Sequence, residues 1–349
     1  MAILESIYRP MTSCNETVSD HDDQNRFHTL AKKRVLVTGA SGFIGRRLVT
    51  TLGSCNRGVD VTAVTRKKGF FSSPVTEITT GGLNGETDWR VPLKGVDDVI
   101  HLAARVHATR EHSVDPASEF RKTNVKATVA LAEQAARAGV KRFVFLSSIK
   151  VNGQYTQPGR PFTSTDTPAP QDAYAQSKAE AEELLHSIAT ETGMEVVIIR
   201  PPLVYGPGVR ANFAAMIQWL RRGIPLPLGR TQNRRSLLAL DNLIDLIMTC
   251  LKDPNAANQT FLASDGQDIS TTELLHKIAA TMNRKAWLVP LPPPIMHMGA
   301  KLAGREDIYQ RLFGSLQVDI SPTQQVLDWR PPLTLEEGLC RTLNAPEST

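Results

Sequence analysis

The sequence predicts an α/β fold, a doubly wound parallel sheet followed by a smaller and irregular C-terminal domain. Apolar, β-branched runs alternate with helix-like segments between residues 33 and 200, and such alternation builds a parallel sheet covered by helices on both faces. A glycine-rich turn joins the first run to the first helix. After residue 200, glycines and prolines break the pattern into short pieces. We expect a flexible extension over residues 1–32, the sheet domain over 33–200 and mainly a second domain over 201–349.

The composition is that of a soluble globular chain. Of the 349 residues, 41% are hydrophobic and 21% are charged. No apolar run approaches the roughly 18 residues of a membrane span, and the first 32 residues do not resemble a secretory signal. The net charge of +5 comes from scattered cations, which favours a solvated surface over a nucleic-acid face. The cysteines lack metal spacing, so we expect a cytoplasmic protein with reduced thiols and no metal: Cys14, Cys55, Cys250 and Cys340.

The first strand and the turn after it predict a Rossmann-type, dinucleotide-binding unit. Residues 34–37 form a short apolar run, and residues 46–52 form the following helix. Gly39, Gly42 and Gly45 lie between them with the spacing Gly-x-x-Gly-x-x-Gly. A turn without Cβ atoms lets backbone N–H groups approach a pyrophosphate, and the helix N-terminus adds partial positive charge. Because a strand precedes the glycines and a helix follows them, we expect a bound dinucleotide.

The end of the second strand indicates which dinucleotide is preferred. Residues 59–65 are strand-like, and Arg66 follows them directly. In dinucleotide folds an acid at this point binds the ribose hydroxyls of NAD, whereas an arginine accommodates the 2′-phosphate of NADP. No acid is present in the run of residues 65–68, Thr-Arg-Lys-Lys. The sequence therefore favours NADP(H), with NAD(H) as the alternative. These cations could instead form an exposed basic turn that contacts no cofactor.

The remaining elements follow the same alternation up to residue 200. Ligands in such folds bind at the carboxyl ends of the strands. The predicted strands are residues 97–104, 142–148 and 195–200, and the predicted helices between them are residues 124–138 and 174–188.

The second domain is predicted to hold short helical pieces over residues 213–222, 242–251 and 271–282. Residues 287–294 are apolar and rich in proline. Together with residues 295–302 they could face a membrane, but packing between domains is favoured.

Ser148, Tyr174 and Lys178 form the constellation with the clearest chemistry. Tyr174 and Lys178 are four residues apart and share one helical face. A tyrosine is a poor base at neutral pH, but a neighbouring ammonium and a positive nicotinamide ring favour the phenolate. Tyr174 could then move a proton to or from a sugar oxygen while Ser148 hydrogen-bonds that oxygen. Each residue alone is unremarkable, whereas all three in this order after a glycine turn point to hydride chemistry.

From residue 33 to residue 343 the sequence resembles the extended short-chain dehydrogenase/reductases, the nucleotide-sugar epimerase/dehydratase family. The resemblance rests on the turn at residues 38–45, His-Leu-Ala-Ala at 101–104, Asn124, Ser147-Ser148, Tyr174-x-x-x-Lys178, residues 200–208 and residues 234–241. It implies a NAD(P)-binding domain over residues 33–200, a nucleotide-sugar substrate domain after it and a homodimer formed through the helices that hold Asn124 and Tyr174.

The resemblance also assigns residues to roles. It makes Ser148, Tyr174 and Lys178 the catalytic triad, with Lys178 also on the nicotinamide ribose. It places Ser148, Asn212 and Arg234 at the substrate, with Asn212 and Arg234 on the nucleotide diphosphate and Arg235 ranked second. The implied cofactor contacts are Gly39, Ser41, Gly42, Phe43, Ile44, Gly45, Arg66, Leu83, Leu102, Ala103, Ala104, Asn124, Tyr174, Lys178 and Pro201.

One departure from the family pattern narrows the reaction. Family dehydratases carry an Asp-Glu pair directly after the catalytic hydroxyl, where this chain has Ile149 and Lys150. Dehydration is therefore disfavoured, and hydride chemistry at C4 of a UDP-sugar remains. Residues 147–153 and 316–319 resemble a bacterial subgroup of surface-polysaccharide synthesis that is often labelled UDP-glucose 4-epimerase and includes reductases of UDP-4-keto-6-deoxy-N-acetylglucosamine. The sequence narrowly favours the 4-keto reductase. The alternatives are the 4-epimerase, a dinucleotide-sensing protein and a hydroxysteroid-type dehydrogenase.

Overall fold

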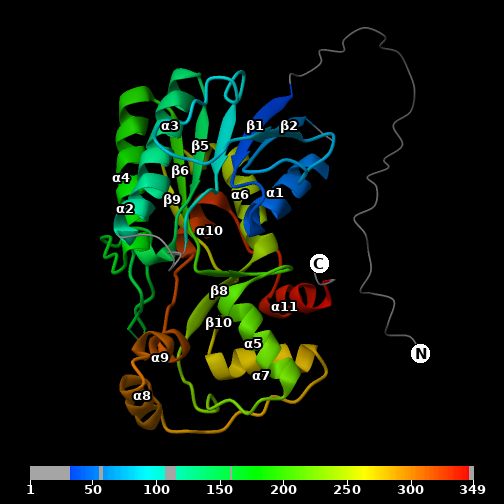
Figure 1. Ribbon diagram of the computed structural model, residues 1–349, viewed down its shortest axis with the longest axis vertical. Coiled ribbons are helices and arrows are strands. Elements are labelled where there is room, and N and C mark those ends of the chain that lie inside the picture. The colour runs from blue at the N-terminus through cyan, green and yellow to red at the C-terminus, as the bar shows by residue number, and fades with distance from the viewer. Residues whose placement is uncertain (1–31, 55–57, 107–114, 158, 346–349) are drawn as a thin grey trace, which may run out of the picture. The chain divides into compact units, whose positions relative to one another are not determined.

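The computed structural model describes residues 32–54, 58–106, 115–157 and 159–345. Its main sheet has seven parallel strands in the order β3-β2-β1-β4-β5-β6-β9, which confirms the predicted fold class (Figure 1). From β1 the chain winds to one edge through β2 and β3, and then returns past β1 to build the other half. The strands are β1 (Lys33–Thr38), β2 (Val59–Thr65), β3 (Thr76–Thr79), β4 (Asp98–His101), β5 (Arg142–Leu146), β6 (Glu195–Arg200) and β9 (Thr260–Leu262).

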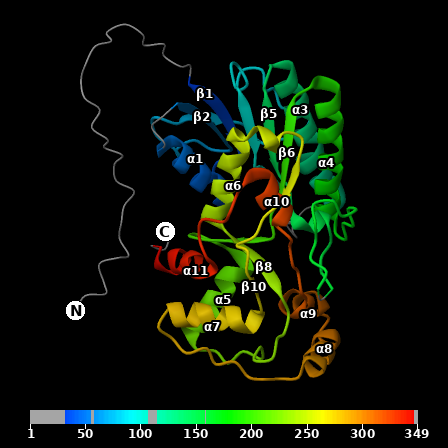
Figure 2. The ribbon, with the colours of Figure 1, turned by 180° about the vertical axis from the view of Figure 1, so that it is seen from behind.

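Helices cover both faces of this sheet, and each face has its own hydrophobic core. In β1, Val35 and Val37 pack with helices α1, α6 and α10, whereas Leu36 packs on the opposite face with α3 and α4. This division follows from the strand geometry, because successive side chains point to opposite faces. Figure 2 shows the α6 side from behind. The helices are α1 (Phe43–Ser54), α3 (Ala127–Arg137), α4 (Ala173–Thr192), α6 (Leu240–Lys252) and α10 (Ser321–Leu327).

A smaller sheet and its helices form a third core. The strands lie in the order β10-β8-β7, with β7 parallel and β10 antiparallel to β8. The helical pieces predicted after residue 200 are confirmed as α5, α6 and α7, of which α6 packs on the main sheet. The elements are β7 (Leu203–Tyr205), α5 (Ala211–Arg222), β8 (Arg235–Ala239), β10 (Asp268–Ile269), α7 (Thr271–Thr281), α8 (Pro293–Leu302), α9 (Glu306–Phe313) and α11 (Leu335–Asn344).

Several boundaries differ from the sequence prediction. The strand predicted over residues 97–104 ends at His101, because Ala103 lies against the glycine turn instead of continuing the ladder. The helix predicted from residue 124 begins earlier, as α2 (Pro116–Phe120) with Asp115 as its N-cap. It continues through the π-helical turn η1 (Arg121–Lys126) into α3. Short 3₁₀ turns follow β5 and α6, at η2 (Ile149–Val151) and η3 (Pro254–Ala256).

The chain returns to the main sheet after residue 200, since β9 pairs with β6 and α6 packs on the core beside α1. The predicted division at residue 200 stays a prediction. The predicted N-terminal extension, apart from residue 32, lies outside the described residues, as do Cys14 and Cys55. Within the described ranges, every helix is too short or too polar to cross a membrane.

Candidate active site

The turn after β1 has the close-packed backbone that a dinucleotide pyrophosphate requires. Gly39 has φ +66°, and a Cβ there would lie 2.7 Å from the backbone nitrogen of Ala103. A Cβ on Gly45 would lie 2.2 Å from the carbonyl oxygen of Gly39. The loop closes through a hydrogen bond from the Gly42 N–H to the Gly39 carbonyl, 2.9 Å. Any side chain at Gly39 or Gly45 would fill the turn, so the residues present fit the predicted cofactor. Ser41, Phe43 and Ile44 complete the turn and begin α1.

A row of buried side-chain hydrogen bonds joins the carboxyl ends of β1 and β4 next to this turn. Thr38 Oγ1 and His101 Nδ1 are 2.7 Å apart, and His101 Nε2 and Thr128 Oγ1 are 2.9 Å apart. Burial, with a smaller effect from Lys178, lowers the pKa of His101 to about 3. The imidazole is therefore neutral at physiological pH and joins β1 and β4 to α3. Leu102, Ala103 and Ala104 follow this edge and are half-buried.

Asn124, predicted as a cofactor contact, lies buried in the π-helical turn. Its amide donates to the Arg105 carbonyl at 3.0 Å and to Ser177 Oγ at 2.9 Å, while its oxygen accepts from the Arg105 N–H at 2.8 Å. Ser177 in turn donates to the Tyr174 carbonyl at 2.7 Å. Asn124 thus ties the segment after β4 to the first turn of the helix that carries Tyr174 and Lys178.

The structure brings Ser148, Tyr174 and Lys178 together at the carboxyl end of β5. Ser148 follows β5 in extended conformation and caps η2, whereas Tyr174 and Lys178 lie one turn apart on α4. Burial raises the pKa of Tyr174 to about 12, against a hydrogen bond with Ser148 that lowers it, and the Asp172 charge adds to the rise. In the protein without ligands, Tyr174 is therefore a protonated phenol bonded to Ser148.

Lys178 is among the most deeply buried polar residues, with 1% of its surface exposed. Its Nζ donates to the Leu146 carbonyl at 2.7 Å and lies 4.2 Å from the centre of the Phe145 ring. Burial lowers the pKa of Lys178 to about 7, against a smaller opposite effect of Glu182. The pKa of this amine thus lies near neutral pH, so small changes in its surroundings decide its charge.

A buried ion pair beneath the triad was not anticipated from the sequence. Arg200 Nε donates to both carboxylate oxygens of Glu182, at 3.0 and 3.1 Å. Ser147 Oγ donates to the same carboxylate, and Arg200 Nη1 donates to Asn152 Oδ1 at 2.9 Å. Ser147 therefore serves the ion pair, which leaves Ser148 as the hydroxyl that meets Tyr174. The signal available in the sequence was the spacing, because Glu182 follows Lys178 by four residues.

A second ion pair, also missed, lies next to Tyr174. Lys150 Nζ is 2.6 Å from Asp172 Oδ2 and 5.9 Å from the centre of the Tyr174 ring. The other oxygen of Asp172 accepts from the Ala175 N–H at 2.7 Å and so caps α4. The position where dehydratases of the resembled family carry a carboxylate thus holds a cation, and that cation is paired with Asp172, the cap of α4.

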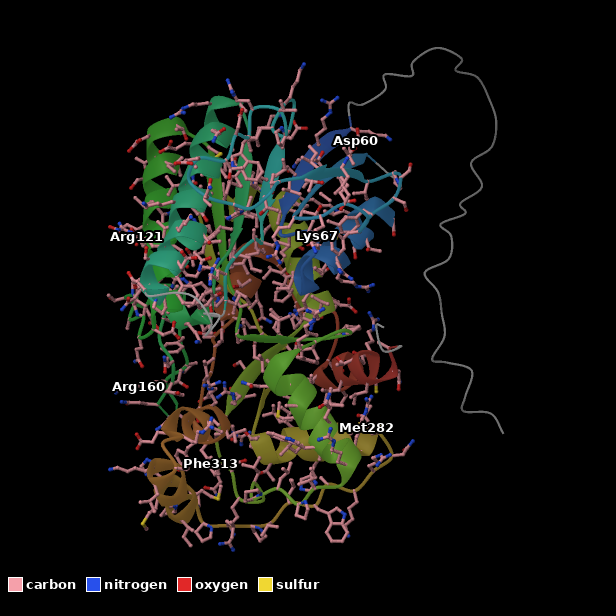
Figure 3. The ribbon with its side chains drawn as sticks, viewed as in Figure 1. Asp60, Lys67, Arg121, Arg160, Met282 and Phe313 are labelled. Atoms are coloured by element: carbon pink, nitrogen blue, oxygen red, sulfur yellow. The ribbon has the colours of Figure 1, made fainter. Side chains whose placement is uncertain are left out.

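At the end of β2 the structure adds an acid that the local sequence lacks. Arg66 is exposed. Glu77 of β3 accepts from Thr65 Oγ1 and from the Gly69 N–H, both at 2.9 Å, and so holds the loop that contains Arg66. Figure 3 labels the neighbouring Lys67. The positive charge on which the cofactor prediction rests is therefore accompanied by a carboxylate from the adjacent strand.

The other predicted residues divide between core and surface. Leu83 packs against the core beneath α3 and α4. Pro201 is buried, and its carbonyl accepts a hydrogen bond from the Ile149 N–H at 3.0 Å. Asn212 lies exposed in the first turn of α5, and Arg234 lies exposed before β8. Arg235 is half-buried, and its Nη1 donates to the Gly314 carbonyl at 3.0 Å. Over the described part of the chain, no hydrogen bond or ion pair joins Asn212 or Arg234 to the triad.

The model of the NAD dependent epimerase/dehydratase family matches residues 35–263. The chain belongs to this family. A UDP-glucose 4-epimerase of Vibrio cholerae is 46% identical over 314 residues, which cover 90% of this chain and 95% of that protein. An N-acetyl-alpha-D-glucosaminyl-diphospho-ditrans,octacis-undecaprenol 4-epimerase of Escherichia coli O157:H7 is 26% identical over 329 residues, 88% of this chain and 94% of that protein.

Solved structures agree with this family membership. The structure of MoeE5 in complex with UDP-glucuronic acid and NAD superposes with a TM-score of 0.71 at 27% identity, covering 89% of this chain and 97% of that one. The comparisons favour the predicted 4-epimerase over the 4-keto reductase that the sequence narrowly favoured.

Proposed function

We propose that this protein is a C4 epimerase of a UDP-linked hexose or N-acetylhexosamine. The observation that carries the proposal is that Ser148, Tyr174 and Lys178 lie together at the carboxyl end of β5, on the side of the sheet that also holds the glycine turn. The 46% identity to a UDP-glucose 4-epimerase supports it. The residue two positions after Ser148 is Lys150, so the site lacks the carboxylate that would help to expel water from a neighbouring carbon.

Side chains of the protein would remove one proton from the C4 oxygen and later return it. When bound, the nicotinamide dinucleotide supplies the hydride acceptor and donor. Tyr174 would accept the C4 hydroxyl proton and later return it, while Ser148 orients the same oxygen. Lys178 would stabilise the phenolate, because an ammonium one turn away offsets its charge. Because burial raises the pKa of Tyr174 to about 12 and lowers that of Lys178 to about 7, the ligand-free pair holds a protonated phenol beside an amine that loses its proton readily.

The nucleotide diphosphate would be bound at the second sheet. Asn212 lies in the first turn of α5, where backbone N–H groups and the helix dipole favour an anion. Arg234 lies exposed before β8 and offers a planar pair of donors to phosphate oxygens. Arg235 ranks second, because its guanidinium already donates to protein carbonyls.

The test is epimerisation without added cofactor. The purified protein is incubated with UDP-glucose or UDP-N-acetylglucosamine, and the C4 epimers are measured by chromatography. Tyr174→Phe should remove nearly all turnover, whereas Tyr309→Phe, at a tyrosine stacked on Phe313 of α9, should retain it. Turnover by Tyr174→Phe at the wild-type rate would refute the assigned role. Competition by UDP separates a nucleotide-sugar enzyme from the hydroxysteroid-type alternative.

The 4-keto reductase is the second candidate, and the exposed Arg66 is the observation that favours it. A reductase must exchange its cofactor in each cycle, and NADP(H) would suit that use. Its test is stoichiometric loss of NADPH with UDP-4-keto-6-deoxy-N-acetylglucosamine. The E. coli relative is named for a sugar diphosphate on undecaprenol, so that lipid-linked substrate belongs in the same panel. Absence of turnover with every member of the panel would favour the dinucleotide-sensing alternative.

The choice of dinucleotide depends on the end of β2. Arg66 supports the predicted NADP(H), whereas Glu77 and the NAD in the structure of MoeE5 support NAD(H). Mass spectrometry of the nucleotide released from the purified protein identifies which one is bound. The homodimer through the helices of Asn124 and Tyr174 is likewise a proposal, and light scattering of the purified protein tests it.

A further inference from the structure

The part of the chain around α8 exposes an unusual amount of apolar surface. Helix α8 contains no buried residue. Of its side chains Ile295 is 56% exposed, Met298 62% and Leu302 85%, and the preceding Trp287 is 60% exposed. The sequence favoured packing between domains for residues 287–302, but of these residues only Leu288 packs on the third core.

A second exposed segment joins this one to form a single surface. The Leu226 N–H donates to the Trp287 carbonyl and the Val289 N–H to the Leu226 carbonyl, both at 2.8 Å. Arg284 Nη1 also donates to the Arg221 carbonyl at 2.7 Å. Figures 1 and 2 agree that the chain between α7 and α8 runs along the end of the molecule beyond α5 and α7. In Figure 3, Met282 and Phe313 mark the regions where this stretch begins and α9 ends. We call residues 219–230 and 283–305 the basic apolar face.

The charges of this face have one sign. Neither residues 219–230 nor residues 283–305 contain an aspartate or a glutamate. The nearest acid in sequence is Glu306, which lies 3.7 Å from His297. The cations of the face are all exposed: Arg221, Arg222, Arg230, Arg284, Lys285, Lys301 and Arg305.

We propose that the basic apolar face docks on the surface of an anionic phospholipid bilayer. A short helix with exposed leucine, isoleucine and methionine, a nearby tryptophan and flanking lysine and arginine is the composition of an element that lies in a membrane interface. The tryptophan ring suits the headgroup level, and the cations complement the negative surface potential of anionic lipids. A second copy of the chain on this face would place the cations of one copy against those of the other. A nucleic acid would pair with the cations but leave the apolar side chains of Ile295 and Leu302 exposed. The proposal does not depend on the reaction assigned above.

The test is binding of the full-length protein to vesicles. Vesicles of phosphatidylcholine alone are compared with vesicles that contain phosphatidylglycerol, by co-sedimentation at low and high salt. We expect binding only with phosphatidylglycerol, weakened by salt because the attraction is electrostatic. The double variant Lys301→Glu/Leu302→Gln should lower the partition coefficient roughly tenfold or more.

A matched control carries the same chemical changes elsewhere. Val91 is 80% exposed and lies three residues from the exposed Lys94, so Val91→Gln/Lys94→Glu should bind like the wild type. Circular dichroism establishes that both variants are folded, and Arg284→Glu/Lys285→Glu provides a charge-only variant. Absence of binding to either vesicle, or equal binding by all variants, would overturn the proposal. So would a concentration-dependent dimer or RNA complex that Lys301→Glu/Leu302→Gln abolishes while vesicle binding persists.

Discussion

Replacing Lys178 by methionine should stabilise the cofactor-free protein near neutral pH while abolishing turnover. Lys178 is almost fully buried, and burial lowers its pKa from 10.5 to about 7. In the unfolded chain the amine keeps its ordinary pKa and stays protonated up to about pH 10. Between these values the unfolded state holds the extra proton, so the stability of the wild type rises with pH.

The size of the effect follows from this difference in pKa. A change in pKa from 10.5 to about 7 lowers the free energy of unfolding by at most about 5 kcal/mol. This penalty is fully present below pH 7 and absent above pH 10.5. By the same relation, the penalty falls by about 2–3 kcal/mol between pH 7.5 and pH 9.5. Methionine removes it, but leaves the Leu146 carbonyl without its donor, at a cost of about 1–3 kcal/mol that does not change with pH.

Urea unfolding of the wild type and Lys178→Met at several pH values measures the difference directly. The stability advantage of the variant should shrink by about 2–3 kcal/mol between pH 7.5 and pH 9.5. Lys94→Met, which removes an exposed lysine, controls for the change in the denatured chain. A difference between wild type and Lys178→Met that stays constant over this range would refute the argument from burial.

Three further predictions concern the surroundings of the triad. Gly45→Ala should abolish measurable dinucleotide binding, because its Cβ would meet the Gly39 carbonyl oxygen at 2.2 Å. Gly299→Ala, whose Cβ would meet nothing within 4 Å, should bind like the wild type, and fluorescence titration with NAD(P)H compares the two variants. Arg200→Met should destabilise the fold by about 3–5 kcal/mol in urea by leaving the Glu182 carboxylate buried without its cation, and Glu182→Gln/Arg200→Met should recover most of that loss. Asp172→Asn should shift the acidic limb of the pH profile of kcat/KM, on which activity rises as Tyr174 loses its proton, to lower pH, because the Asp172 charge raises the pKa of Tyr174. Lys150→Met should shift the same limb to higher pH, because it leaves the Asp172 charge unpaired, and shifts in the same direction by both variants would contradict the pairing.

The local parts of the fold could be predicted from the sequence, because their signals are local. Strand β1, the glycine turn and α1 occupy consecutive residues, and the spacing of Tyr174 and Lys178 along one helix is fixed by its period. The start of α2 was missed although Asp115 followed by proline is a readable cap. Strands β3 and β9 have four and three residues and could not be found locally, since only pairing with β2 and β6 makes them strands.

The electrostatic partners could not be predicted because they are brought together by the fold. Glu77 reaches Thr65 from the neighbouring strand, and Lys150 reaches Asp172 across 22 positions of the chain. Either contact changes the chemistry expected from the isolated motif. The first places a carboxylate beside Arg66, from which the cofactor preference was predicted, and the second pairs an acid next to Tyr174, the proposed catalytic base, with a cation.

The geometry of strand and helix explains why two adjacent serines have different roles. The backbone is extended at Ser148, and successive side chains of an extended chain point to opposite sides. Ser147 therefore turns toward Glu182, and Ser148 toward Tyr174. Tyr174, Lys178 and Glu182 follow one another at intervals of four along α4, so one helix stripe faces the end of β5 with a phenol, an amine and a carboxylate. Because Arg200 neutralises Glu182, the charge state of the stripe depends on Lys178, whose pKa burial lowers to about 7.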